Sequence, residues 1–519
     1  MNDALFESRR QEGRDALNAR RPDAAAAIFR ALVAERPDHA GARIELGVAL
    51  SQAGDQTAAL VEFSRAADLA PRDAFVHVNM GLAFERAGLL TEAEAAMRLA
   101  RQFAPDNPAI VFNLANVARK LGRNQESEKL YREVIAAEPH AVAARQNLAA
   151  LLLDEWRLNE ARSLLRRAEE IAPDDAGASF NLANAERMAG DLPAAIAAYE
   201  RALAKSPEWP EAHFNLGFAA LLAGDWKRGW KEFAWRWGTP AQAAFARRFD
   251  RPRWTGEAGD GRGLLLRAEQ GLGDTLQFVR YAALAKARGW RVMLETPATL
   301  IPALARTKGI DAFVVQGASL PAFDAEAPLL DLPGIFGTTI DTVPADIPYV
   351  TPDPARVAAW RTTLGPKRGP RVGLVWGGNP DFPGDRWRSP GLKPLLPLVA
   401  CAEIDWIGLQ LGPRRADLAG WTPPANFHDV AESLSNMGET AACLANLDAL
   451  VTSCTAAAHL AGAMGIGTYL LLSSAPDWRW MLGGARTPWY PHMKLYRQTL
   501  PGDWQLPVME LVRDMAALR

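Results

Sequence analysis

The chain has 519 residues, with 58 Lys and Arg against 60 Asp and Glu and a formal net charge of -2. This length exceeds what one hydrophobic core supports, so we expect two or three domains. The near-neutral balance argues against a protein built to bind nucleic acid or an anionic membrane surface, and we expect neither partner.

The cysteines and the uncharged segments indicate a cytoplasmic protein. Cys401, Cys443 and Cys454 are few and odd in number, which does not suggest a disulfide framework. The first residues, MNDALFESRRQEGR, lack the apolar segment of a signal peptide. The longest uncharged run, 449–475, is rich in Gly, Ser and Thr, so we interpret it as strand, loop, helix and strand and expect no membrane span.

The first half of the chain repeats with a period of 34 residues. A proline column comprises Pro37, Pro71, Pro105, Pro139, Pro173 and Pro207. A small-residue column comprises Gly47, Gly81, Ala115, Ala149, Ala183 and Gly217. A bulky column comprises Phe29, Phe63, Met97, Tyr131, Leu165, Tyr199 and Phe233. Small residues let paired helices approach closely, bulky residues fill the space between them, and proline ends each second helix.

This pattern resembles the tetratricopeptide repeat, from about Phe6 to Thr239, with six full repeats and a seventh that lacks the proline. The resemblance implies an all-α solenoid that binds a polypeptide. The seventh unit is rich in Trp, which favours a hydrophobic cap that joins the array to the next domain.

One polar column also keeps the 34-residue step: Asn79, Asn113, Asn147, Asn181 and Asn215. In tetratricopeptide arrays this position lies on the first helix of each pair and faces the concave groove. A carboxamide both donates and accepts hydrogen bonds, so a row of them can hold a peptide backbone whatever its side chains. The row is similar to the asparagine ladder of the eukaryotic O-GlcNAc transferase. In the alternative interpretation, these residues cap or bridge neighbouring helices.

After Asp250, short apolar runs alternate with helical stretches, which is typical of doubly wound parallel sheets. The expected strands form two sets: 263–269, 291–296 and 311–316, then 371–378, 405–412, 448–453 and 467–473. A proline-containing stretch at 347–360 and a charged hinge at 365–371 separate the sets.

Two such domains resemble the GT-B fold, and nearly the whole chain resembles bacterial tetratricopeptide-linked glycosyltransferases related to the heptosyltransferase family. The segments that carry the resemblance are GLGDTLQFVRY, VGLVWGGNPDF with DRWRS, LANLDALVTSCTAAAHLAGAMG, and APDWRWML with TPWYPHMKLYRQ. The expected architecture is therefore a repeat array (1–243), an acceptor-side α/β domain (244–365) and a nucleotide-sugar-binding α/β domain (366–519).

The first candidate site residue is Asp274, which follows the first expected strand and opens a helix. Ligands of open α/β sheets bind outside the carboxyl ends of the strands. Gly271 and Gly273 allow the backbone to turn tightly and approach a ligand. The matching aspartate of the family is the proposed base that deprotonates the acceptor hydroxyl, and the resemblance implies this role for Asp274. The motif alone is equally compatible with a helix N-cap.

Two later loops are expected to hold the donor. Asn379, Arg386, Arg388 and Ser389 follow the strand that begins at 371, and arginine offers a fixed fork of donors to phosphate oxygens. A solvated basic loop is the alternative.

The third loop contains Cys454, Thr455 and His459 at the start of a helix, where free N–H groups favour an anion. We expect His459 to face this open helix start rather than a core. The family has aspartate where this chain has Cys454, which weakens the transfer of a donor type and leaves room for a degenerate site.

Asp477 and Trp478 complete the candidate donor site, because a carboxylate and an aromatic face can hold a base or a sugar ring. Packing of the domain interface would use the same residues, and the sequence does not decide between them. We expect no bound metal and no cofactor other than the nucleotide-sugar substrate, since GT-B enzymes generally need none.

The leading hypothesis is an inverting protein glycosyltransferase whose repeats present Ser or Thr hydroxyls of a bound protein. The resemblance extends to bacterial flagellin glycosyltransferases, with a nonulosonic acid such as pseudaminic acid from its CMP form as a candidate donor. Two alternatives remain open: a non-catalytic adaptor with a degenerate α/β half, and a transferase for lipopolysaccharide or another glycan.

Overall fold

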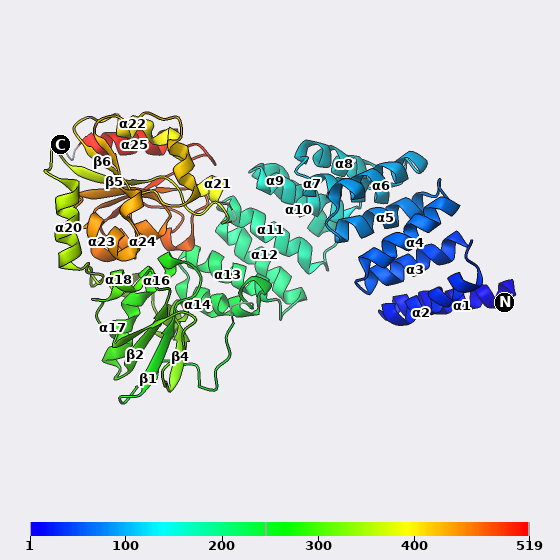
Figure 1. The fold of residues 1–519 in the computed structure, drawn as a ribbon, viewed down its shortest axis with the longest axis horizontal. Coiled ribbons are helices and arrows are strands. Elements are labelled where there is room, and N and C mark those ends of the chain that lie inside the picture. The colour runs from blue at the N-terminus through cyan, green and yellow to red at the C-terminus, as the bar shows by residue number, and fades with distance from the viewer. Residues whose placement is uncertain (1, 244–245, 383, 517–519) are drawn as a thin grey trace. The chain divides into compact units, whose positions relative to one another are not determined.

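The computed structural model describes residues 2–243, 246–382 and 384–516 (Figure 1). The chain forms two compact units, Met1–Ala185 and Glu186–Arg519. Residues 1, 244 and 519, at which predicted domains begin or end, lie outside the described residues.

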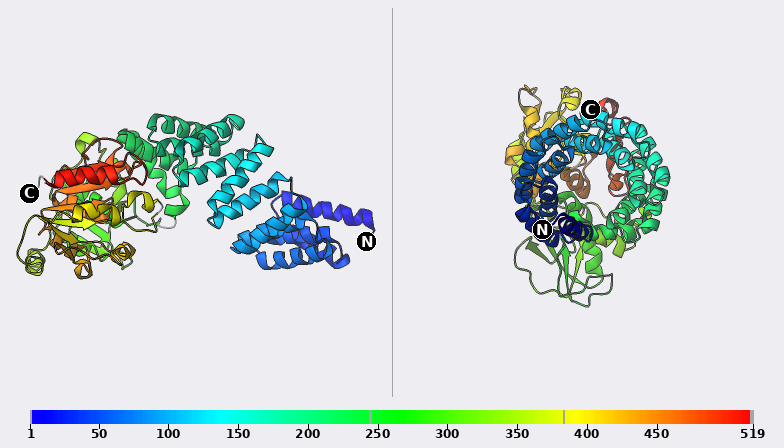
Figure 2. Two further views of the ribbon diagram at one scale, coloured as in Figure 1. Left: turned by 90° about the horizontal axis from the view of Figure 1, so that it is seen from above. Right: turned by 90° about the vertical axis from the view of Figure 1, so that its right-hand side faces the viewer.

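The first unit consists of antiparallel helix pairs, which follow one another in blue to cyan along a curved path (Figure 2). Its helices are α1 (Asp3–Asn18), α2 (Pro22–Glu35), α3 (Ala40–Gln52), α4 (Gln56–Leu69), α5 (Ala74–Arg86), α6 (Leu90–Phe103), α7 (Pro108–Lys120), α8 (Asn124–Ala137), α9 (Val142–Asp154), α10 (Leu158–Ile171) and the first part of α11 (Ala176–Met188).

The small and bulky columns of the sequence meet inside each pair. A Cβ atom added to Gly47 would lie 2.5 Å from the Phe63 ring, and one added to Gly81 would lie 2.8 Å from Met97. All seven members of the bulky column are buried. In these two repeats the glycine therefore sets the distance between the paired helices, and a larger residue would displace the facing side chain, whereas three other repeats have alanine at this position.

The turn between the two helices of each pair also recurs every 34 residues. Its residues have a positive φ: Arg20, Gly54, Gly88, Gly122, Trp156, Gly190 and Gly224. Glycine adopts this left-handed conformation without the strain that a Cβ atom introduces.

The second unit begins with the last helices of the array: α12 (Leu192–Lys205), α13 (Pro210–Ala223), α14 (Trp226–Phe233), η1 (Ala234–Gly238) and α15 (Pro240–Ala243). Trp226 stacks on Trp489 with ring centroids 5.3 Å apart, and the Trp230 indole donates to the Thr338 carbonyl at 2.8 Å. Trp226, Trp230 and Phe233 of the seventh repeat are thus part of the α/β core.

The first sheet has the order β3-β2-β1-β4 and is parallel throughout the described residues. Its elements are β1 (Gly263–Arg267), α16 (Leu272–Phe278), η2 (Val279–Tyr281), α17 (Ala282–Ala287), β2 (Arg291–Thr296), α18 (Ile301–Leu304), β3 (Ala312–Val315), β4 (Ala325–Pro328), η3 (Leu329–Asp331), α19 (Leu332–Ile335) and η4 (Ile340–Thr342).

The second sheet is also parallel, with the order β10-β9-β8-β5-β6-β7. Its elements are α20 (Pro354–Leu364), β5 (Arg371–Val375), α21 (Asp385–Arg388), η5 (Lys393–Leu395), α22 (Leu396–Val399), β6 (Asp405–Gly408), η6 (Pro413–Leu418), β7 (Phe427–Asp429), η7 (Ala431–Ser433), α23 (Met437–Leu444), β8 (Ala449–Ser453), α24 (Ala456–Met464), β9 (Thr468–Leu472), η8 (Trp478–Trp480), β10 (Met493–Arg497) and α25 (Gln505–Met515).

In both sheets the strand order reverses beside the first strand. Numbered within each sheet, the orders are 3-2-1-4 and 3-2-1-4-5-6, and in such sheets ligands bind at the carboxyl ends where the order reverses. These positions are the ends of β1 and β4 in the first sheet and of β5 and β8 in the second.

The predicted fold class, a helical repeat array followed by parallel α/β sheets, is confirmed. All seven expected strands are present, and β4, β7 and β10 were not predicted. β4 contains Glu326 and Pro328 rather than an apolar run, but it is buried because Glu326 pairs with Arg267 on β1 at 2.8 Å. Among the described residues, no helix has the length and apolar character needed to cross a lipid bilayer.

Candidate functional site

The helices that follow the first strand of one sheet and the fourth strand of the other pack directly against each other. They are α16, which begins after β1, and α24, which begins after β8. A Cβ atom added to Gly273 on α16 would lie 2.7 Å from Cδ2 of His459 on α24. Gly273 therefore permits the contact that brings the strand ends of the two sheets together.

Asp274 lies at this contact, as the third residue of α16, with 18% of its side chain exposed. Its Oδ2 accepts a hydrogen bond from the Gly271 N–H at 2.9 Å, so the carboxylate caps the helix start. Its Oδ1 accepts from Nη2 of Arg479. Burial raises the pKa of the Asp274 carboxyl, while the Arg479 guanidinium and the Gly271 N–H oppose that rise.

Arg479 was not predicted from the sequence, although its place between two tryptophans in WRW was a usable signal. Its Nε donates to Oε1 of Gln277 at 2.6 Å, and its Nη1 donates to Oδ1 of Asp477 at 2.9 Å. Its guanidinium lies 4.4 Å from the ring centroid of Trp478, which is buried. The predicted residues Asp477 and Trp478 thus surround a guanidinium of the chain itself.

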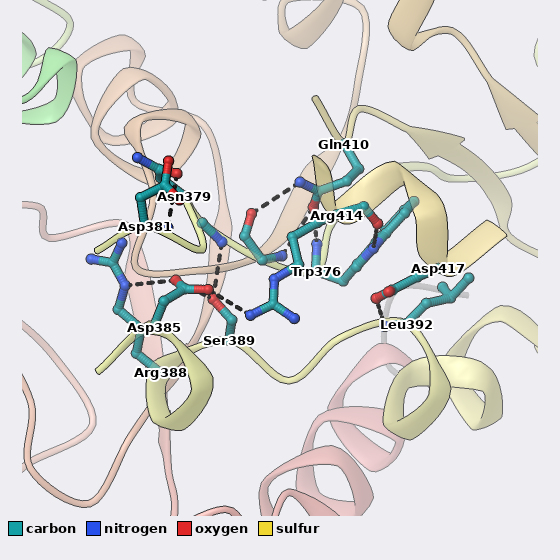
Figure 3. Close-up of polar contacts among 12 residues, drawn as sticks. Trp376, Asn379, Asp381, Asp385, Arg388, Ser389, Leu392, Gln410, Arg414 and Asp417 are labelled. Carbon is teal, nitrogen blue, oxygen red and sulfur yellow. Dashed lines mark hydrogen bonds and ion pairs between the residues drawn. The ribbon is translucent and has the colours of Figure 1, made fainter. Parts of the chain in front are cut away.

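A second polar cluster lies at the carboxyl end of β5 (Figure 3). The buried Asp385 carboxylate accepts hydrogen bonds from Ser389 Oγ at 2.8 Å, Arg388 Nε at 3.1 Å and Arg414 Nη2 at 2.6 Å. Ser389 Oγ also accepts from the Gly378 N–H at 2.9 Å. We call these residues the Asp385 cluster.

The two arginines of the Asp385 cluster retain solvent contact, because a quarter of each side chain is exposed. Arg414 lies on η6 after β6, and no site residue was predicted from the sequence in that segment. Asp385 orients both guanidinium groups without neutralising both, so the cluster keeps one positive charge beside the strand ends.

The remaining predicted residues of this loop have local roles. Asn379 accepts from the Asp381 N–H at 3.1 Å, which closes a turn, and the Arg386 guanidinium lies 4.9 Å from the Trp387 ring centroid. Gln410, which follows β6, holds this loop in place, because its Oε1 accepts a hydrogen bond from the Gly377 N–H at 2.9 Å.

The loop after β8 lies between the two clusters. The Thr455 hydroxyl is 3.0 Å from the Thr452 hydroxyl, and Cys454 Sγ accepts from the Trp480 indole at 3.1 Å. Burial raises the pKa of the Cys454 thiol, and the guanidinium groups of both Arg388 and Arg479 act to lower it. Cys454 therefore lies within electrostatic reach of both clusters.

His459 is buried, whereas we expected it from the sequence to face an open helix start. Its Nδ1 is 3.0 Å from the Tyr490 hydroxyl, and its ring stacks on Trp480 with centroids 5.2 Å apart. Burial lowers the pKa of His459 well below its ordinary value, and the guanidinium of Arg479 adds to this shift. Because its pKa is lowered, the His459 imidazole is neutral in the contact between α16 and α24.

The charges of the two clusters are of opposite sign. With every group counted as ionised, Asp274 and Asp477 with Arg479 have a formal net charge of -1, whereas Asp385 with Arg388 and Arg414 has one of +1. Three buried polar atoms here have no hydrogen-bond partner among the described residues: Gln277 Nε2, Arg414 Nε and Ser453 Oγ. Buried polar atoms are seldom left unpaired, so these are suited to bind water or a ligand.

The end of the repeat array reaches the first sheet through Arg236 on η1. Its Nη2 donates to Glu269 at 2.7 Å and to Asp331 at 2.6 Å. Glu269 follows β1 and Asp331 follows β4, so this guanidinium lies where the order of the first sheet reverses. This role of Arg236 was not predicted from the sequence.

All five residues of the asparagine column lie on the first helix of a pair and are half-buried. Asn147 and Asn79 make hydrogen bonds within the array. Asn147 Nδ2 donates to Asn116 Oδ1 at 2.9 Å, which also accepts from the Tyr131 hydroxyl, and Asn79 Nδ2 donates to the Phe75 carbonyl. The bridging alternative therefore describes Asn147, and a half-exposed amide at this position is still suited to bind a peptide.

Comparison with known proteins supports the repeat assignment. Residues 10–74 and 118–185 match models described as "Tetratricopeptide repeat", and residues 183–224 match a model described as "TPR repeat". The chain is 28% identical over 328 residues to protein FlbA of Caulobacter vibrioides, covering 56% of this chain and 52% of that protein. This chain spans about half the length of that curated relative.

Several solved structures resemble part of the chain. PilF of Pseudomonas aeruginosa is 18% identical with a TM-score of 0.36 and covers 40% of this chain and 93% of its own. YrrB, described as "a TPR protein with an unusual peptide-binding site", is 20% identical with a TM-score of 0.29 and covers 34% and 92%. A thermophilic TPR protein of Thermus thermophilus is 22% identical with a TM-score of 0.31 and covers 35% and 98%.

Proposed function

We propose that the protein is a glycosyltransferase of the GT-B type that moves a sugar from a nucleotide-sugar to Ser or Thr hydroxyls of a protein bound by its repeats. One observation carries the proposal. A carboxylate at the strand ends of the first sheet, Asp274, is joined through one contact region to a cationic cluster at the strand ends of the second.

In the proposed reaction, Asp274 accepts the proton of the acceptor hydroxyl while the hydroxyl oxygen attacks the anomeric carbon of the donor sugar. The bond from that carbon to the donor phosphate oxygen breaks, its electron pair leaves with the phosphate, and the configuration inverts. Burial favours this role, because it makes the carboxylate of Asp274 more basic than an exposed aspartate.

The leaving phosphate belongs beside Arg388 and Arg414. Their exposed donors can stabilise the negative charge that develops when the bond breaks, and Asp385 already orients both groups. The N-terminus of α24 at Thr455 adds unpaired backbone N–H groups at the same strand ends.

Tetratricopeptide repeats bind protein partners, and the asparagine column supports a peptide-binding face. The acceptor is therefore proposed to be a protein, with flagellin as a candidate and a CMP-activated nonulosonic acid as a candidate donor. The adaptor alternative rests on Cys454, because the resembled family has an aspartate at this position. The Cys454 sulfur accepts a hydrogen bond from the Trp480 indole.

The test uses the full chain with a lysate from a strain that lacks the gene. A panel of CMP-, UDP-, GDP- and ADP-activated sugars is added in turn, and intact masses of the lysate proteins are measured. Asp274→Asn is the site variant, and Asp341→Asn, which changes an exposed aspartate on η4, is the matched control.

The proposal expects a sugar mass on Ser or Thr with the wild type and with Asp341→Asn, but none with Asp274→Asn. Modification by Asp274→Asn would exclude this residue as the base. Altered envelope glycans with unchanged protein masses would support the glycan alternative. Binding of a protein partner without any donor consumption would support the adaptor.

A further inference from the structure

Arg479 joins the two α/β sheets at the candidate base. It lies on η8, after the fifth strand of the second sheet, whereas its partners Asp274 and Gln277 lie on α16, after the first strand of the first sheet. These partners are 205 and 202 positions away in the sequence. The contact therefore exists only while η8 is packed on α16.

The ion pair is largely removed from water, since 7% of the Arg479 side chain and 18% of the Asp274 side chain are exposed. Asp477 fixes Arg479 twice, through the guanidinium and through the backbone N–H at 3.0 Å. A guanidinium with this much support cannot leave Asp274 without breaking several charge-assisted hydrogen bonds.

We propose that Arg479 is a positioning residue that orients the Asp274 carboxylate and keeps it in its charged form from across the contact between the two sheets. This inference rests on the proposed function for the role of Asp274 as a base. It adds a residue to the reaction and makes the competence of the base depend on the packing of the two α/β halves.

The groups that face Asp274 explain why a cation is needed. From its own helix start, the Gly271 N–H favours the charged form; from the loop before η8, the Asp477 carboxylate disfavours it. From α24, His459 contributes an imidazole whose pKa is too low to supply a charge near neutral pH. Arg479 is the cation that offsets burial and the like charge of Asp477.

The experiment measures the titration of Asp274 without any substrate. The full-length protein is labelled with a water-soluble carbodiimide and glycine ethyl ester at a series of pH values, and the peptide carrying Asp274 is quantified by mass spectrometry. Glu432, whose side chain is 92% exposed, serves as the internal reference for the pH dependence of the reagent.

The variants separate charge from packing. Arg479→Gln and Arg479→Met both remove the charge, and Gln retains hydrogen-bonding capacity if the Met variant does not fold. Arg479→Lys restores the charge. Arg497→Met is the matched control, because Arg497 supports the same loop through the carbonyls of Trp480, Met481 and Gly484.

We expect the labelling midpoint of Asp274 to move to higher pH by about 1–3 units in the neutral variants, to return most of the way in Arg479→Lys, and to stay unchanged in Arg497→Met. No movement in the neutral variants, or an equal movement in Arg497→Met, would overturn the inference. Because the labelling needs no turnover, it can succeed even if Asp274→Asn still transfers sugar, which would reject only the proposed function.

Discussion

The Arg236 guanidinium and the Glu269 carboxylate form a two-point contact, Nη2 to Oε1 at 2.7 Å and Nε to Oε2 at 3.2 Å, with 1% and 4% of their side chains exposed. The first residue belongs to the end of the repeat array and the second to the loop that leads to Asp274. The array is thereby connected by an ion pair to the candidate catalytic loop.

Replacing Arg236 by Ala is expected to destabilise the second unit by about 3–5 kcal/mol, because Glu269 would remain as a buried charge without its partner. The measurement is urea unfolding followed by tryptophan fluorescence. Arg228→Ala is the control, since its pair with Glu200 is partly exposed on both sides and should contribute no more than about 1 kcal/mol. Equal losses in the two variants would show that the buried pair has no special weight.

Gly273→Ala tests the contact between α16 and α24. The added methyl group would lie 2.7 Å from His459, so we expect a loss of about 1–3 kcal/mol of stability from overpacking. Gly483→Ala is the control, because a Cβ atom there meets nothing within 4 Å. The measurement is the midpoint temperature of thermal unfolding of both variants. A midpoint for Gly273→Ala equal to that of the control would contradict the close contact.

His459 makes the stability of the protein sensitive to acid. Its pKa is depressed in the folded state, so below about pH 6.5 the unfolded chain takes up a proton that the folded chain does not. The free energy of unfolding is therefore expected to be highest above about pH 6.5. Below that pH it should fall by about 1.4 kcal/mol for each pH unit, down to the pKa of His459 in the folded protein.

Urea unfolding at a series of pH values measures this slope. His459→Gln removes the titrating group while keeping an acceptor for the Tyr490 hydroxyl, and it should flatten the profile in that window. His428→Gln, at an exposed position on β7, should leave the slope as it is. A slope that survives His459→Gln would assign the acid sensitivity to another group.

Arg414→Met is expected to weaken binding of a nucleotide-sugar about 10- to 100-fold, because a hydrogen bond to a charged group contributes about 1.5–3 kcal/mol. Isothermal titration calorimetry with the donor selected from the panel gives the dissociation constant. The neighbouring Arg415 pairs with Asp429 at the end of β7, so Arg415→Met should bind as the wild type does. Equal affinities of the two variants would place the donor away from the Asp385 cluster.

The fold was predictable where its determinants are local or periodic. Small and bulky columns such as Gly47 and Phe63 lie within one repeat, and the inner strands are continuous apolar runs. β4 escaped prediction because its burial depends on a charge pair between Glu326 and Arg267, whose two members lie on different strands.

The candidate site was predictable only in part for the same reason. The segments that follow strands were identified: Ser389 and Cys454 lie in loops, and Asp274 lies in the first turn of α16. The pairing of Asp274 with Arg479 was not, because the residues are 205 positions apart and no period connects them. His459 was expected at an open helix start, and Tyr490 and Trp480, from a segment that follows α24, bury it.

The packing of Trp226 and Trp230 into the α/β core divides the repeats into two kinds. Helices before Ala185 contact mainly their own neighbours, so whole 34-residue blocks can be added, deleted or exchanged there, which changes the length of the array. The helices from α12 to η1 are bound to the sheets by buried tryptophans and Arg236, so they cannot be exchanged without changing the α/β core. The N-terminal repeats are in this sense the exchangeable part of the protein, and the second unit is the constant part.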